Sequence, residues 1–122
     1  MSDPASAPVV DVAGALRRVG GDGALLRELV GIFLEDLPGR VAELREAVGA
    51  ADTVGVERLA HTMGGSHAAL EARGAQRLAS ELTALARQAR LDAAPALFAR
   101  LEAELGRVAA FLAAPGWESA PS

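Results

Sequence analysis

The stretch of sequence that decides the fold runs from Asp22 to Gly49 and reads DGALLRELVGIFLEDLPGRVAELREAVG. Its apolar residues recur at steps of four or three, which is the period of one face of an α-helix. They are Leu25, Leu29, Phe33, Leu37, Val41, Leu44 and Val48. The stripe predicts one long helix that begins after an N-cap at Asp22 and ends at Gly49. Pro38 lies inside it, but the period continues past the proline, so we expect a bent single helix rather than two.

Shorter helices are predicted on both sides of this segment. Asp11 is a suitable N-cap for a helix that runs to Arg18 and ends at Gly20-Gly21. Downstream, the periodicity predicts helices from Asp52 or Thr53 to Leu70, from near Gly74 to the break at Leu91-Asp92, and over about 92–114. Their inward faces would carry Val56, Leu59, Met63, Ser66 and Leu70; Leu78, Leu82 and Leu85; and Leu97, Leu101, Leu105, Val108 and Leu112. Because the connections are short, we expect an all-α fold: an antiparallel up-down four-helix bundle with a short additional N-terminal helix.

Length and the two ends of the chain predict a single domain. The 122 residues suffice for one modest core. Residues 1–10 and 115–122 have the Pro, Ser and Gly content of disordered tails, so we place the bundle domain at 11–114. The N-terminus lacks the features of a secretory signal, and no apolar run is long enough to cross a membrane. A soluble cytoplasmic protein without a membrane partner is the expectation.

Composition excludes several classes of function. All 12 basic residues are arginine, so chemistry that needs a lysine amine is excluded. There is no cysteine, which excludes disulfides, thiolate metal sites and a cysteine nucleophile. The 16 acidic residues give a net charge of −4, the wrong sign for an unaided nucleic-acid binder.

One histidine is predicted to face solvent in the helix that begins near Thr53. Leu59 is predicted on the inward face of this helix. At roughly 100° per residue, His61 falls about 200° around the helix from Leu59 and therefore faces solvent. Small residues follow it on the outer face: Gly64, Gly65 and Ala68. Two glycines inside a helix cost about 1 kcal/mol each relative to alanine. Either they let another helix pack closely or break the helix, or they clear space so that another protein can approach the imidazole ring.

The segment around this histidine resembles a known family. Residues 59–70, LAHTMGGSHAAL, are similar to the signature of histidine-containing phosphotransfer (HPt) domains, usually Ala-His-x-Leu-Lys-Gly-Ser/Ala followed by small residues and an apolar one. Residues 29–38, LVGIFLEDLP, and 76–82, QRLASEL, are similar to the family's flanking helices. The resemblance covers about residues 11–112.

The resemblance implies a covalent phosphoryl carrier without independent turnover. His61 would accept a phosphoryl group on Nε2 from the aspartyl phosphate of one receiver domain and pass it to another. The implied partners are response-regulator receiver domains, a hybrid histidine kinase, or both, with a monomeric carrier. No cofactor is expected on this chain, because Mg²⁺ would be supplied by the receiver. Neutral imidazole is a competent nucleophile near neutral pH and needs no buried general base.

The sequence departs from the family pattern at Gly64, where a lysine is usual. Arg58, one turn before His61, is either its substitute or an ordinary surface arginine. Glu57, four residues before His61, is placed either to orient the ring or to be an ordinary exposed residue. An alternative function follows from the missing lysine: an HPt-like module that docks receivers or another signalling partner without carrying phosphate.

Two further expectations concern the surroundings of His61. By analogy with the family, receivers would dock on the His61 face, with Thr62 and Ala68, and on the exposed side of the first helix around Val12 and Leu16. His67 lies about 120° around the helix from His61, at the expected core boundary, so a two-histidine metal site is not predicted.

Overall fold

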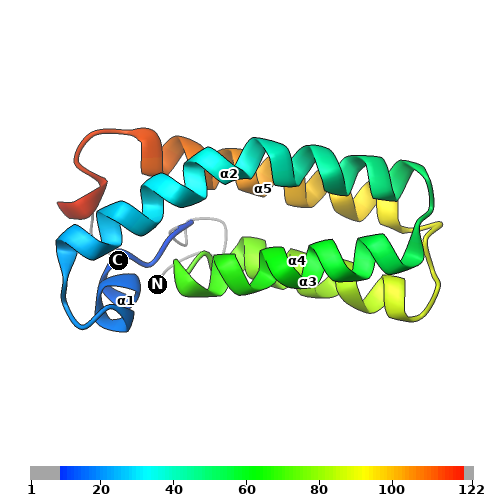
Figure 1. The fold of residues 1–122 in the computed structure, drawn as a ribbon, viewed down its shortest axis with the longest axis horizontal. Coiled ribbons are helices and arrows are strands. Elements are labelled where there is room, and N and C mark those ends of the chain that lie inside the picture. Colours follow the sequence, from blue (N-terminus) through cyan, green and yellow to red (C-terminus); the bar gives the residue numbers. More distant parts are fainter. Residues whose placement is uncertain (1–8, 120–122) are drawn as a thin grey trace, which may run out of the picture.

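The computed structural model describes residues 9–119, which form five α-helices and one short 3-10 turn without any strand (Figure 1). The elements are α1 (Val12–Arg18), α2 (Gly23–Gly49), α3 (Thr53–Ala69), α4 (Arg73–Arg87), α5 (Ala94–Ala113) and the 3-10 helix η2 (Trp117–Ser119). The predicted all-α class, with four bundle helices and a short additional N-terminal helix, is confirmed. Among these residues, no helix is long and apolar enough to cross a membrane.

The four long helices form two layers. Figure 1 shows α2 beside α5 in one layer and α3 beside α4 in the other, with α1 at one end of the bundle. Contacts join α3 to α4, α4 to α5, α2 to α3 and α2 to α5, so the helices close a ring around one core. This arrangement leaves one long side of each helix at the surface.

Helix starts follow a simple capping rule. The carboxylates of Asp11, Asp22 and Asp52 accept a backbone N–H three residues later, from Gly14, Leu25 and Gly55 respectively. Each bond satisfies an N–H group that the first turn of a helix leaves without a partner. The caps at Asp11 and Asp22 were predicted, and Asp52 takes the cap of α3.

Helix α4 begins without a side-chain cap. The buried carboxylate of Glu104 lies beside its first turn, and a methyl group added at Gly74 would be 2.7 Å from Glu104 Oε2. Arg107 pairs with the same carboxylate. A carboxylate at a helix N-terminus is stabilised by the helix dipole, which accounts for a buried glutamate at this point of the core.

The long helix is continuous through Pro38, as predicted, but its first turns bury a different stripe. Leu37 and Leu44 are in the core, whereas Leu25 and Leu29 are 39% and 36% exposed. Leu26 and Val30 are buried in their place. The prediction of Leu25 and Leu29 as inward was wrong because each has an apolar neighbour one residue on, and contacts from other helices choose between the two phases.

The same shift occurs in α3. Its buried face is centred on Ala60, Met63 and His67, and the predicted Leu59 and Ser66 are only half-buried. Helix α4 ends at Arg87, earlier than expected, and the chain turns at Ala89 with a φ of 55°. The bounds of the other helices agree with the prediction to within two residues.

Both ends of the domain extend further than expected. Val10, predicted in a disordered tail, is buried, and the N–H of Asp11 donates to the carbonyl of Glu71 at 3.1 Å. Trp117, also predicted in a tail, is buried at the end of the bundle and begins η2. Val9 and Val10 pack on the core at one end and Trp117 at the other, and the Pro, Ser and Gly content of these segments conceals the contacts. Residues 1–8 and 120–122 of the two predicted tails lie outside the described residues.

Candidate functional site

His61 lies in the middle of α3 with its side chain exposed. It borders a hollow of about 310 Å³ between α3 and α4. The hollow is lined from α3 by Ala60, His61, Gly64, Gly65 and Ala68, and from α4 by Gln76, Ser80, Thr83 and Arg87. The α3 residues are small around the imidazole, so the ring stands beside open space.

The two glycines are not needed by the fold. Helix α3 runs unbroken through Gly64 and Gly65, so they do not interrupt it. A methyl group at Gly65 would meet nothing within 4 Å, and one at Gly64 would lie 3.8 Å from Ala79 Cβ, an ordinary contact. The helix-break and close-packing explanations therefore fail, and the space beside His61 opens to solvent.

Glu57 forms an ion pair with an arginine of α4. Its Oε1 accepts a hydrogen bond from Arg87 Nε at 2.9 Å, which joins α3 to α4. The sequence left two roles open for this carboxylate, orienting the His61 ring or being an ordinary exposed residue, and in the structure its hydrogen-bond partner is an arginine. Sequence reasoning missed Arg87, because only the packing of α4 on α3 brings it to the hollow that His61 borders.

Arg58 and Thr62 lie on the exposed face of α3. The Thr62 hydroxyl donates to the carbonyl of Arg58 at 3.0 Å. Within residues 9–119, Arg58 forms no ion pair, and it does not line the hollow. The cationic side chain in the hollow therefore comes from Arg87 and not from Arg58.

The residues expected to dock a partner divide into two groups. Thr62 is exposed and Ala68 is half-buried beside His61. On α1, Leu16 is half-buried but Val12 is only 5% exposed, so the expectation of Val12 on an exposed side was wrong. Helix α1 has about two turns, and its face with Val12 and Ala15 closes the end of the core.

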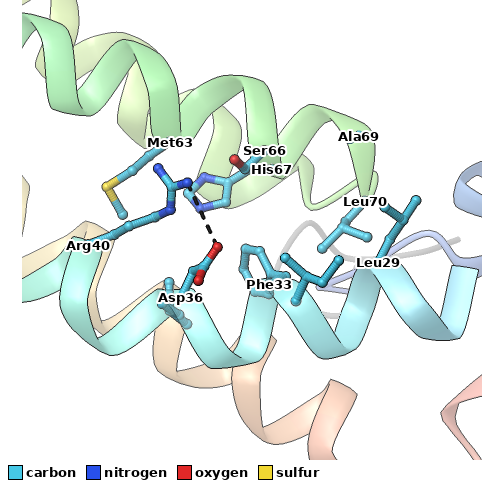
Figure 2. Close-up of a pocket in the computed structure, with 11 residues that line it drawn as sticks. Leu29, Phe33, Asp36, Arg40, Met63, Ser66, His67, Ala69 and Leu70 are labelled. Atoms are coloured by element: carbon cyan, nitrogen blue, oxygen red, sulfur yellow. Dashed lines mark ion pairs between the residues drawn. The ribbon is translucent and has the colours of Figure 1, made fainter.

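The second histidine is in the core rather than at its boundary. His67 is 1% exposed, and Phe33 meets its ring edge-on, with ring centroids 5.8 Å apart (Figure 2). Burial lowers the pKa of His67 from 6.5 to about 4, with a further decrease from the charge of Arg40, although a hydrogen bond with the Ala75 backbone opposes both. His67 is therefore neutral near pH 7. No cluster of three metal-ligating side chains exists among the described residues.

Comparison with known proteins identifies the family. Residues 28–111, more than half of the chain, match the model of the Hpt domain, so the chain belongs to the histidine-containing phosphotransfer family. Proteins of this family are phosphocarriers that interact with receiver domains and histidine kinases in phosphorelays. The recognition made from residues 59–70 is thereby confirmed.

A solved structure of a histidine-containing phosphotransfer protein is also similar to this chain. Histidine-containing phosphotransfer protein B from Pseudomonas aeruginosa PAO1 superposes with a TM-score of 0.78 and is 28% identical in sequence. The match covers 88% of this chain and 93% of that one. A search of curated proteins finds no match.

The open space at Gly65 leads to a stability prediction. Gly65→Ala should raise the free energy of unfolding by about 1 kcal/mol, because alanine loses less backbone entropy in a helix and its methyl group meets nothing. Gly106→Ala in α5 is the matched control, since that glycine is also exposed and a methyl group there also has room. Urea unfolding of the wild type and of the two variants measures the gain in the free energy of unfolding for each substitution. A loss of stability in Gly65→Ala alone would show that the fold needs this glycine.

Burial of His67 predicts a pH-dependent stability. Between pH 6.5 and about 4 the imidazole of His67 binds a proton in the unfolded chain but not in the folded chain. The free energy of unfolding therefore falls as the pH falls. The loss approaches about 1.4 kcal/mol per pH unit, on the order of 3 kcal/mol in total. His67→Leu should remove this slope between pH 6.5 and 5, measured by urea unfolding at each pH.

Glu71 provides the control for that measurement. Hydrogen bonds from Arg18 and Arg73 lower the pKa of its carboxyl below 4.5, so its stabilisation is present above pH 4.5 and is lost only below it. Glu71→Gln should therefore keep the slope between pH 6.5 and 5. If His67→Leu kept it as well, another group would be responsible.

Proposed function

We propose that the protein carries a phosphoryl group on Nε2 of His61, which it accepts from the aspartyl phosphate of one receiver domain and delivers to the aspartate of another. The observation that carries the proposal is the exposed imidazole on an unbroken helix, beside two glycines whose space nothing in the fold uses. A receiver active site can approach such a ring without moving any part of this chain.

In the transfer reaction the carrier has to supply only an accessible imidazole. The Nε2 lone pair of neutral His61 attacks the phosphorus atom, the N–P bond forms, and the P–O bond to the donor aspartate breaks, so that the aspartate leaves as a carboxylate. The ring proton stays on Nδ1. The second transfer reverses these steps on another receiver. Because phosphoryl transfer depends mainly on positioning and on stabilising charge, the receiver can supply the rest, including the Mg²⁺ expected on its side.

Arg87 is the residue of this chain best placed to replace the missing lysine. It lines the same hollow as His61, and its bond to Glu57 uses only Nε. Among residues 9–119 the two terminal nitrogens of Arg87 have no acceptor, so they can donate to phosphoryl oxygens. Charge-assisted bonds of this kind are among the stronger polar contacts. Glu57 would then position Arg87 rather than the imidazole ring.

A second candidate function follows from Gly64, which stands where the family usually has a lysine. In that case the chain docks receivers or another signalling partner but carries no phosphate. The same surface around His61 serves both functions, and only the covalent step differs.

Labelling with phosphorylated receiver domains tests the proposal. His61→Gln should abolish acid-labile, base-stable phosphate on this chain and leave the melting temperature nearly unchanged, because the exposed side chain contributes little to the fold. His67→Gln is the matched control, since a side chain that is 1% exposed cannot reach a receiver, and it should retain the label. Label that persists in folded His61→Gln would refute the assignment, and absence of label in the wild type would favour the docking module.

The role of Arg87 has its own test. Arg87→Ala should shorten the phosphohistidine lifetime or slow transfer by roughly three- to tenfold, a modest factor because the guanidinium is solvent-exposed. Arg58→Ala should have the smaller effect, and Arg100→Ala, an exposed arginine of α5, should have none. Adding Gly64→Lys to Arg87→Ala should restore much of the loss. Equal lifetimes in Arg87→Ala and Arg100→Ala would leave the stabilising charge entirely to the receiver.

A further inference from the structure

The hollow that His61 borders extends past the imidazole ring along α3. Gly64 and Ala68 line it three and seven residues after the histidine. At a rise of about 1.5 Å per residue, seven residues of helix span roughly 10 Å. That is the length of about three residues of extended chain. A phosphoryl group on His61 would occupy only the end of the hollow at the ring, so the part from Gly64 to Ala68 is open to another group.

This part of the hollow has a floor of small residues on α3. A Cβ atom at Gly65 would meet nothing within 4 Å, and one at Gly64 would lie 3.8 Å from Ala79 Cβ. An incoming chain can therefore come close to the helix backbone here. The level of Gly64 with Ala79, together with the Glu57–Arg87 bond, shows that α3 and α4 run antiparallel.

The wall of the same part carries two polar side chains of α4. Gln76 is half-buried and Ser80 is exposed, and both line the hollow. Within residues 9–119 neither side chain forms a hydrogen bond, whereas the neighbouring Thr83 hydroxyl donates to the carbonyl of Ala79. An amide and a hydroxyl each provide a donor and an acceptor. The wall is therefore suited to a group that also carries both.

The spacing of these two side chains fits an extended backbone. Gln76 and Ser80 are one turn apart, a rise of about 6 Å. Alternate residues of an extended chain are about 6.6 Å apart and turn their N–H and C=O groups to the same edge. Each of those residues offers one backbone donor and one backbone acceptor. Two alternate residues could therefore bond to the two side chains at once.

Charge also favours a neutral occupant. None of the residues that line this part, Gly64, Gly65, Ala68, Gln76 and Ser80, is charged. The charged residue of the lining, Arg87, is at the His61 end and is paired with Glu57. A charged side chain of a partner would lose hydration here without gaining an opposite charge.

We propose that this part of the hollow holds the backbone of an extended loop of the receiver domain, hydrogen-bonded through two alternate residues to Gln76 and Ser80. The inference rests on the proposed function, because transfer to or from His61 is what brings a receiver to the same hollow. Gln76 and Ser80 then position the receiver and take no part in the covalent step.

Two phosphoryl donors of different size separate docking from chemistry. A phosphorylated receiver that labels the wild type carries the loop, whereas phosphoramidate, which releases ammonia when its N–P bond breaks, does not. Gln76→Ala and Ser80→Ala should each slow transfer from the receiver below saturation by roughly two- to tenfold, the range of one neutral hydrogen bond. Labelling by phosphoramidate should change little. Gln88→Ala, the same substitution at the exposed C-terminal end of α4, is the matched control.

A variant of the floor gives a second measurement. Gly65→Met should place its side chain in the hollow and slow transfer from the receiver by roughly tenfold or more. Gly106→Met, the same change at an exposed position of α5, should not. The inference is wrong if the receiver labels all these variants at the wild-type rate, or if both donors are slowed alike. If phosphoramidate labels the wild type but no receiver does, the proposed function fails and this inference with it.

Discussion

The face that α3 buries against its neighbours is the constraint on which the rest of the structure depends. Ala60 and Met63 are in the core, and Ala75 and Ala79 of α4 are fully buried. Small side chains in these positions let two helices approach closely. Once this face is fixed, the 3.6-residue period sends His61 outward and His67 inward. The exposed imidazole is therefore a consequence of how the opposite side of its helix packs.

Much of the fold could be predicted because the decisive signals are local. Aspartate caps and apolar periods near 3.6 identify the helices, and the histidine, the glycines and their neighbours lie on one continuous segment that resembles a family. The phase of burial could not be predicted where two apolar residues are adjacent, as at Leu25 and Leu26. An apolar stripe through either residue of such a pair has the helical period. Contacts between helices decide which of the two residues is buried.

The other features that the sequence did not predict all depend on contacts between different elements of the fold. Arg87 reaches the hollow beside His61 only because α4 packs on α3, and Trp117 is buried only because the chain after α5 folds back on the bundle. Val12 is buried because α1 closes one end of the core. His67 is buried because α2 packs on α3 and brings Phe33 against its ring, a contact that the motif alone does not predict.

In the proposed function an arginine on α4 takes the place of a lysine on α3, and this substitution changes how the charged side chain is held. A lysine one turn after the histidine would be positioned by the helix itself, whereas Arg87 is positioned by the packing of two helices and by its ion pair with Glu57. The charge beside the imidazole then depends on the same α3–α4 contact that turns His61 outward. In the proposed function the charge that Arg87 brings to the hollow therefore depends on the packing of α4 on α3, so a substitution that loosens this contact would also displace the guanidinium group.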